Sequence, residues 1–434
     1  MVYRLTTQLN EKIRHFAKFP QTGVSLRQMV LFGRKIGQNP SPGTLLRASQ
    51  FLAEELPIRL AHRVKELDEL PHNLNTMPSI VKVKNWYAQS FEDLINFPKA
   101  NLPQSIKEKF AASALKETKL PESRPNLSVK YFPSSAPQKP VVPLEHRYYS
   151  NIDGIDWPPE VYDYNERFTK LIEAIKRRHD PVVTTVGILE YKSHRKSKLV
   201  DTDVQSFLDR FYMSRIGIRM LIGEYARQEQ QDGQQVALNR LPSRPDYVGI
   251  ICTKTNIAET VQEAADNAKY ICEDYYGLFK APEVQLHCPQ DLIFTYVPSH
   301  LSHMLFELLK NSLRAVVETF GYGKDEYPTI KVIVAEGKED ITVKISDEGG
   351  GIPRSSIPLV WTYMYTTAEA QELDPDFNKS DFKAPMAGFG YGLPISRLYA
   401  RYFGGDLKLI SMEGFGTDVY LHLNRISNSD EPLQ

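Results

Sequence analysis

The spacing of apolar residues changes near the middle of the chain. In the first part they recur at helical intervals, as Leu56, Leu60, Val64 and Leu67 do. Later segments such as Ile330–Val334 alternate apolar and polar side chains, which indicates strands. A chain of 434 residues is long enough for two or three domains. The change predicts an α+β protein, in which a four-helix type bundle precedes an α/β sandwich with a mixed, mostly antiparallel sheet.

Composition places the domain boundaries. We predict a helical domain at 1–235, a sheet-containing domain at 236–425 and a C-terminal tail at 426–434. Ten of the 29 prolines lie at about 98–159, which predicts a mostly irregular insertion there. Pro57 suits the first position of a helix. The expected helices of the first domain are Asn10–Phe19, Ser25–Gly33, Thr44–Glu55, Pro57–Leu70, Ser79–Phe97, Val161–His179, Val182–Lys196 and about Asp203–Gln228.

The second domain alternates predicted strands with predicted helices. Ile330–Val334 and Ile341–Ile345 flank a short polar turn and are expected to form a hairpin. The helix that follows the strand Ile293–Tyr296 is expected to begin after Ser299 as its N-cap. The other expected strands are Tyr247–Cys252, Val284–Cys288, Leu407–Ser411 and Thr417–Leu423, and the other expected helices are Ile257–Tyr276 and Leu393–Tyr402.

Whole-chain composition argues against several classes of partner. With 53 basic and 53 acidic side chains, the chain has no net field that would attract nucleic acid. No apolar run approaches the roughly 18 residues of a membrane span, so no membrane insertion is expected. Cys252, Cys272 and Cys288 are odd in number and lack metal-ligand spacing, which fits a reducing compartment. The basic N-terminal residues resemble an organelle-targeting sequence only weakly.

One predicted helix carries a row of polar side chains. His303, Glu307, Asn311 and Arg314 lie on one face at three- and four-residue intervals, opposite an apolar face. Such a helix, taken alone, is more often a solvated amphipathic helix than a catalytic one. Two glycine motifs downstream change that balance.

The two glycine motifs suit a nucleotide. Asp347 comes directly before three glycines, where a carboxylate can accept the amine of a purine and the backbone can approach the base. Gly388–Leu393 precedes a helix, so its backbone can cradle phosphate. Each motif alone is weak, and neither the dinucleotide, the Walker nor the eukaryotic protein-kinase pattern is present. The 36 residues of Ile352–Ala387 between them are long enough for a lid.

Taken in order, the E-x-x-x-N helix, D-x-G-G-G, G-x-G-x-G and Gly416-Thr417 resemble the GHKL ATP-binding superfamily. Within it, the chain resembles the mitochondrial kinases of 2-oxo acid dehydrogenase complexes, and among these most closely the pyruvate dehydrogenase kinases. The likeness includes Glu55-Leu-Pro-Ile-Arg-Leu-Ala, Trp86-Tyr-Ala-Gln-Ser-Phe and Phe207-Leu-Asp-Arg-Phe-Tyr-Met-Ser-Arg, and it spans about residues 15–97 and 160–423.

The resemblance implies a serine kinase that uses ATP and Mg²⁺ to phosphorylate and inactivate the α subunit of pyruvate dehydrogenase. In that reading Glu307 is the general base, His303 tunes it, Asn311 is the magnesium ligand and Asp347 binds adenine. The remaining expected nucleotide contacts are Lys310, Arg314, Gly349, Gly351, Thr366, Thr367, Gly388, Phe389, Gly390, Tyr391, Gly392, Leu393 and Thr417, with Thr366 and Thr367 in the lid.

The helical domain would carry regulation. The resemblance implies a groove for the lipoyl domain of the acyltransferase core, together with a pocket for pyruvate-like acids. The expected pocket residues are Tyr87, Ser90, Lys176, His179, Arg215 and Arg219. The arginines suit a carboxylate, although ordinary surface charges explain them equally well. Lys176 stands where relatives generally have arginine, so a point charge replaces a bidentate fork and puts acid sensitivity in doubt.

The resemblance also implies a homodimer in the mitochondrial matrix. Related animal kinases exchange a C-terminal tail with an Asp-Trp pair between subunits, whereas this sequence has no tryptophan after Trp361. Dimerisation through the sheet is therefore expected, and tail exchange is not.

Three other functions remain open on the sequence. A two-component histidine kinase needs a phosphoacceptor histidine on a preceding helix, and no histidine lies between His194 and His287. An ATP-driven conformational machine of the chaperone or mismatch-repair type shares the ATP motifs, but the preceding helical bundle argues against it. The closest rival is branched-chain 2-oxo acid dehydrogenase kinase, which Leu60-Ala-His62-Arg63 favours. Phe211–Arg215 and His300–Phe306 favour the pyruvate enzyme.

Overall fold

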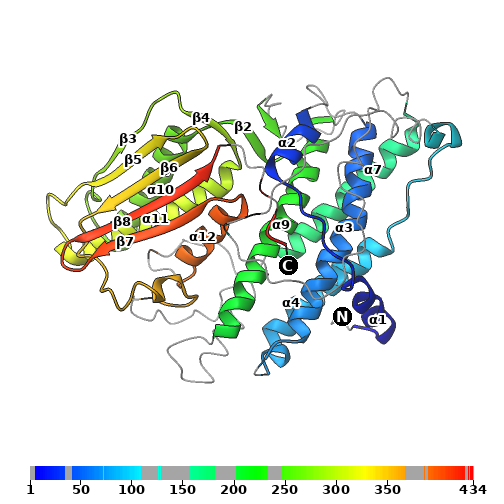
Figure 1. Ribbon diagram of the computed structural model, residues 1–434, viewed down its shortest axis with the longest axis horizontal. Helices are drawn as coiled ribbons and strands as arrows, with labels where there is room; N and C mark the ends of the chain where they lie inside the picture. The colour runs from blue at the N-terminus through cyan, green and yellow to red at the C-terminus, as the bar shows by residue number, and fades with distance from the viewer. Residues whose placement is uncertain are drawn as a thin grey trace.

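The chain folds into a helical half and a sheet half that lie side by side, with one helix between them (Figure 1). The computed structural model describes residues 5–34, 42–71, 73–108, 126, 128, 157–180, 202–232, 246–366, 386, 390–425, 429 and 431–433. The predicted helix at Val182–Lys196 and most of the proline-rich insertion lie outside these residues.

Four long helices form the bundle that the sequence predicts, with fully buried side chains such as Leu60 and Phe168 in its core. They are α3 (Pro42–Asp68), α4 (Pro78–Ile95), α7 (Pro159–His179) and α9 (Thr202–Asp232). A short 3-10 helix, η1 (Leu74–Thr76), leads into α4. Two shorter helices precede the bundle: α1 (Thr7–Phe16) packs on α3 and α4, and α2 (Leu26–Arg34) lies beside strand β1.

The prediction of two helices separated at Pro57 is wrong, because α3 runs unbroken through that residue. Proline removes one main-chain hydrogen bond from a helix interior. Here Leu56 and Leu60 on either side are completely buried, and Val64 is nearly so. Burial of this continuous apolar stripe holds the two segments in line despite the lost hydrogen bond.

The sheet half is built on a five-stranded sheet in the order β3-β5-β6-β8-β7. Its strands are β3 (Val284–His287), β5 (Ile330–Glu336), β6 (Asp340–Asp347), β7 (Asp406–Met412) and β8 (Gly416–Asn424). Only the β3–β5 pair is parallel among these strands. Two helices, α10 (Ile257–Tyr276) and α11 (Pro298–Phe320), cover one face (Figure 1). This is the predicted α/β sandwich.

Two local predictions in this half are wrong. The single strand expected at Tyr247–Cys252 is a hairpin of β1 (Tyr247–Val248) and β2 (Ile251–Asn256), because Gly249 adopts a positive φ of 53° and turns the chain. With β4 (Ile293–Tyr296) these strands form a separate three-stranded sheet. The N-cap of α11 is Val297 rather than Ser299, because Pro298 occupies the first helical position.

The helix between the halves is α12 (Gly392–Tyr402). It packs on α11 and β7 of the sheet half and on α9 of the bundle, and it also contacts η2 (Leu359–Trp361). Its N-terminal end follows the second glycine motif. Among the helices that the structure describes, none combines the length and the apolar character needed to cross a bilayer.

Candidate active site

Helix α11 buries its apolar face against the sheet half and turns its polar row toward α12. Leu301, Met304 and Leu305 are completely buried. Glu307 is half-buried and forms an ion pair with Lys310 at 2.9 Å. The amphipathic pattern thus fixes a carboxylate and an ammonium group at the junction of two helices.

The first residue of α12 lies directly against Glu307. A Cβ atom placed on Gly392 would lie 2.2 Å from Oε2 of Glu307, so any larger residue there would displace this carboxylate. The free N–H groups at the start of a helix favour negative charge. A phosphate held by this end of α12 would therefore lie beside the carboxylate that the sequence assigns as the base.

His303 lies one turn before Glu307. Its ring meets Tyr399 of α12 edge-on, with 5.4 Å between the ring centroids. Part of His303 is exposed, but the surrounding protein lowers the pKa of its imidazole, and the charge of Glu307 acts in the opposite direction. A neutral imidazole at this point can exchange a proton or a hydrogen bond with its neighbours.

Asp347 closes the other end of the site. Its carboxylate is 6% exposed and accepts hydrogen bonds from Ser312 Oγ at 2.8 Å and from the Gly349 N–H at 3.0 Å. Burial raises the pKa of Asp347, while these hydrogen bonds oppose the shift. Thr417 is paired with Asp347 across the sheet, and its hydroxyl lies 2.8 Å from that of Ser411. Ser312 and Ser411, which contact these candidate residues, were not predicted from the sequence as part of the site.

The second glycine motif is only partly described. Gly390 adopts a φ of 78°, and a Cβ there would lie 2.5 Å from the Tyr365 carbonyl oxygen, so only glycine fits. Its carbonyl oxygen accepts a hydrogen bond from the Met364 N–H at 3.1 Å. Gly388, Phe389 and Thr367 lie outside the described residues, and Thr366 is exposed at their edge.

The remaining predicted contacts are spread along the same helices. Arg314 forms an ion pair with Glu318 at 2.8 Å on α11. Gly351 lies beyond Asp347 with a φ of 71°. Tyr391 and Leu393 flank the start of α12 and are half-buried. Their roles stay predictions.

Bundle helix α9 reaches this site through the segment before Gly390. Gln205 accepts a hydrogen bond from the Tyr363 N–H at 2.9 Å, and Asp209 accepts one from the Tyr363 hydroxyl at 2.6 Å. The rings of Tyr212 and Tyr363 stack, and Tyr391 packs against both. No sequence motif signalled these contacts, because they join residues about 150 positions apart.

The donor set suits a magnesium ion that is carried by a nucleotide. No group of three or more His, Cys, Asp or Glu residues that could hold a metal occurs in the described part of the chain. Asn311 offers one half-buried amide oxygen, one turn after Glu307. Mg²⁺ commonly takes one or two protein ligands and completes its shell with phosphate and water. Asn311 therefore fits the magnesium prediction.

Comparison with known proteins identifies the family. Residues 296–426 match the family described as histidine kinase-, DNA gyrase B-, and HSP90-like ATPase, and residues 23–252 match mitochondrial branched-chain alpha-ketoacid dehydrogenase kinase. A mitochondrial pyruvate dehydrogenase (acetyl-transferring) kinase of Schizosaccharomyces pombe is 47% identical over 98% of each chain. The chain belongs to the pyruvate dehydrogenase kinase family. It is a protein kinase with a GHKL ATP-binding domain.

Other members of the pyruvate dehydrogenase kinase family show the same breadth of similarity. The Arabidopsis thaliana kinase is 42% identical over 98% of this chain and 96% of its own length. Human isozyme 3 is 37% identical over 96% of this chain and 86% of its own length. These relatives are named as mitochondrial enzymes, which supports a mitochondrial location.

Several of the residues predicted for an acid pocket lie close together in the bundle. His179 stacks on Tyr87, with ring centroids 4.5 Å apart, and its Nε2 atom lies 3.0 Å from Ser90 Oγ. Burial, followed by the charge of Arg215, lowers the pKa of His179 to about 3. His179 is therefore neutral at physiological pH.

Two arginines of α9 contact the C-terminal end of α7. Arg215 donates to the carbonyl oxygens of His179, at 2.5 Å, and of Asp180, at 3.2 Å. Arg219 pairs with the Asp180 carboxylate at 2.6 Å. Lys176 is half-buried one turn before His179 and makes none of these contacts. Asp180, which the sequence analysis did not name, is thus already the partner of an arginine that was predicted to bind an acid.

Proposed function

We propose that this kinase transfers the γ-phosphoryl group of Mg-ATP to a serine hydroxyl of the pyruvate dehydrogenase α subunit and so inactivates it. The relatives described above are all named as kinases of pyruvate dehydrogenase. The observation that carries the proposal is the contact between Glu307 and Gly392, which sets a carboxylate beside the phosphate-binding end of α12. We place the enzyme in the mitochondrial matrix.

Each part of the site has one task in this mechanism. Asp347 accepts the amine of adenine, and the Gly390–Gly392 backbone with the start of α12 holds the phosphates. Glu307 takes the proton of the serine hydroxyl as its oxygen bonds to the γ-phosphorus and ADP leaves. His303 orients Glu307. A magnesium ion held through Asn311 would neutralise charge on the phosphates.

Replacing Glu307 by Gln tests the base. The amide keeps the shape but cannot accept the proton, so kcat should fall by about 100-fold or more, a typical contribution of a general base. Binding of ADP, followed by calorimetry, should change little. Wild-type kcat in the Glu307→Gln kinase would exclude this residue as the base.

The substrate is tested by competition. Because the family matched by residues 23–252 is named for the branched-chain enzyme, the two dehydrogenase complexes should be presented together with labelled ATP. We expect label in the pyruvate dehydrogenase α subunit. Label only in the branched-chain enzyme would replace this substrate assignment while leaving the kinase mechanism intact.

We also propose the division of labour and the partners. Residues 1–235, with the insertion at about 98–159, would bind the lipoyl domain of the acyltransferase core and regulate activity. Residues 236–425 would bind nucleotide, and 426–434 form the tail. The open face and rim of the sheet expose Ile333, Ile410, Met412 and Phe415, which suits a second copy of the chain. Ultracentrifugation should show a dimer, and Met412→Glu should weaken it.

A pyruvate-like acid would have to compete with Asp180 for Arg219 in the acid pocket. Lys176 supplies a flexible point charge in place of an arginine fork, so inhibition by such acids should be weak. Kinase assays with dichloroacetate should show stronger inhibition of Lys176→Arg than of the unaltered enzyme. Equal inhibition of Lys176→Arg and of the unaltered enzyme would show that Lys176 does not contribute to acid binding.

A further inference from the structure

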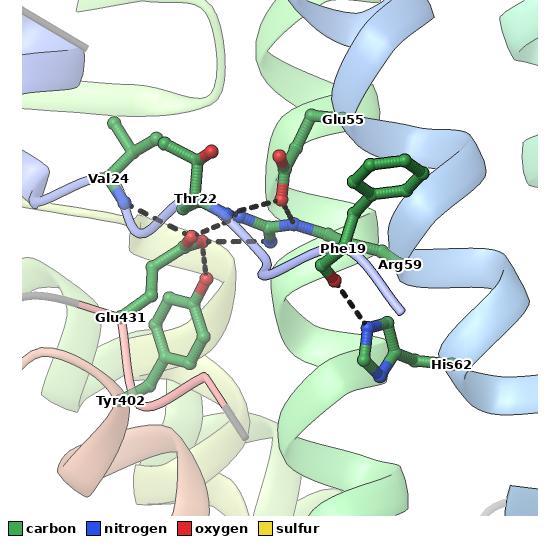
Figure 2. Close-up of polar contacts among 8 residues, drawn as sticks. All are labelled: Phe19, Thr22, Val24, Glu55, Arg59, His62, Tyr402 and Glu431. Atoms are coloured by element: carbon green, nitrogen blue, oxygen red, sulfur yellow. Dashed lines mark hydrogen bonds and ion pairs between the residues drawn. The ribbon is translucent and has the colours of Figure 1, made fainter. Parts of the chain in front are cut away.

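A carboxylate from the C-terminal segment is buried at the junction of the two halves. Glu431 is 2% exposed, although it lies 372 positions from its main partner in sequence. Its Oε2 atom accepts a hydrogen bond from Arg59 at 2.5 Å and one from the Val24 N–H at 3.2 Å. The Tyr402 hydroxyl donates to its Oε1 atom. Figure 2 shows these three groups converging on the one carboxylate.

Arg59 is the centre of the cluster. Its side chain is 1% exposed and lies between Glu431 and Glu55, whose Oε1 atom accepts from Nε of Arg59 at 2.9 Å (Figure 2). The guanidinium also donates to the Thr22 carbonyl oxygen at 2.7 Å. Burial opposes its charge, but Glu431 and Glu55 raise the pKa of Arg59 above its ordinary value. Arg59 therefore keeps its charge at any physiological pH, while burial also raises the pKa of its partner Glu55.

The cluster joins four separate parts of the chain. Arg59 belongs to α3, Val24 precedes α2, Tyr402 ends α12 and Glu431 comes from the C-terminal segment. Helix α9 passes so close that a Cβ on Gly217 would lie 3.0 Å from the guanidinium and 3.1 Å from the Tyr402 hydroxyl. Because α9 carries glycine there, nothing separates Glu431 from the end of α12.

Helix α12 itself links this end to the candidate nucleotide site. The helix is 11 residues long, so at about 1.5 Å per residue its two ends are about 16 Å apart. Gly392 at the other end touches Glu307. Close packing around a helix resists small, continuous deformation. A shift at one end of the helix is therefore transmitted to the other end.

We propose that Glu431 is a positioning residue for the nucleotide site. By holding Tyr402 against Arg59, the C-terminal segment of the same chain fixes α12 and thereby sets Gly392 against Glu307. The proposal rests on the assignment of α12 to nucleotide binding and is independent of which protein is phosphorylated.

Two conservative variants test the proposal. Glu431→Gln places amide N–H donors against the donors of Arg59, whereas Tyr402→Phe keeps the ion pair and removes only its link to α12. Each should weaken Mg-ADP binding by about tenfold, or about 1.4 kcal/mol, a typical coupling between two sites. The double variant should lose no more than either single one, because both cut the same connection. KM for ATP should rise in parallel, with kcat changed less than KM.

Matched variants separate positioning from simple stability. Glu336→Gln breaks the exposed pair of Glu336 with Arg425, and Tyr327→Phe removes a hydroxyl bonded to the Gly321 carbonyl oxygen. Neither should alter ADP binding. Affinities are measured by calorimetry well below each variant's Tm, and Glu431→Asp should restore part of the affinity. Unchanged ADP affinity in Tyr402→Phe, with or without a lower Tm, would overturn the proposal, and that result would leave the kinase assignment untouched.

Discussion

The two ends of α12 have opposite character. At its N-terminal end, Glu307 is half-buried beside Gly392 and pairs with Lys310 at 2.9 Å. At its C-terminal end, Arg59 and Glu431 are buried and every polar group of the cluster has a partner among the described residues. One end keeps groups accessible to a substrate, while the other fixes the helix. Loss of a group should therefore lower mainly kcat at the first end, and mainly stability and nucleotide affinity at the second.

The largest effect is expected from Arg59→Met. It leaves Glu55 and Glu431 buried without a counter-ion, so the free energy of unfolding should fall by about 3–5 kcal/mol. Urea denaturation provides the measurement. Arg425→Met, which breaks an ion pair of partly exposed groups, serves as the control and should cost less than about 1 kcal/mol. Similar losses in the two variants would mean that the C-terminal end of α12 is no more tightly held than the surface.

Gly392→Ala should give the converse result. The new methyl group would displace the Glu307 carboxylate by about 1 Å, which typically costs about 100-fold in kcat. The unfolding free energy should change little, because alanine favours the helix. Steady-state kinetics and urea denaturation of the same preparation provide both numbers. A stability loss with normal kcat would contradict the division between the two ends.

A third variant concerns the cap of α12. Asn126 is completely buried and donates to the carbonyl oxygens of Arg401, at 3.0 Å, and of Tyr402, at 3.3 Å. Asn126→Ala leaves these carbonyl groups without that donor, so we expect a loss of about 2 kcal/mol in unfolding free energy. Ser128→Ala removes one bond to the Gly404 carbonyl oxygen and should cost less. An unchanged unfolding free energy in Asn126→Ala would show that water replaces the hydrogen bonds from Asn126 to the end of α12.

The sequence pointed to candidate residues at the N-terminal end of α12, but it did not point to the contacts of Glu431 or Asn126 at its C-terminal end. Glu307, Asp347 and the glycine motifs could be found because their chemistry requires particular residue types at short spacing. Nothing comparable marks Glu431 or Asn126, whose partners lie hundreds of positions away. Hydrophobic periodicity was enough to predict the bundle and the sandwich. It was not enough to predict that α3 is unbroken, because the burial of apolar residues on both sides of Pro57 outweighs the tendency of proline to end a helix.

The smallest effect is expected in the middle of α12. There, the pH dependence of stability reports on the packing of α11 against the segment that joins the two ends. His300 of α11 packs on Tyr399 of α12, with 4.5 Å between ring centroids, and it also faces His303 and Arg219. Burial, followed by the electrostatic effects of His303 and Arg219, lowers the pKa of His300 to about 3. The unfolded chain therefore binds a proton below about pH 6.5 that the folded chain does not. The contribution of neutral His300 is complete above that pH and is lost progressively as the pH falls toward 3.

Between pH 7.5 and 5.5 this loss should amount to about 1 kcal/mol, because His300 is only half-buried. Urea denaturation at both pH values measures it, and in His300→Gln the decrease should be smaller by that amount. The pKa of His179 is also lowered, but His179 is present in both proteins. Its contribution to the pH dependence therefore cancels when the two decreases are compared. An equal decrease in unfolding free energy in the unaltered enzyme and in His300→Gln would show that a charged imidazole fits between α11 and α12. The middle of α12 would then resemble its accessible N-terminal end rather than its buried C-terminal end.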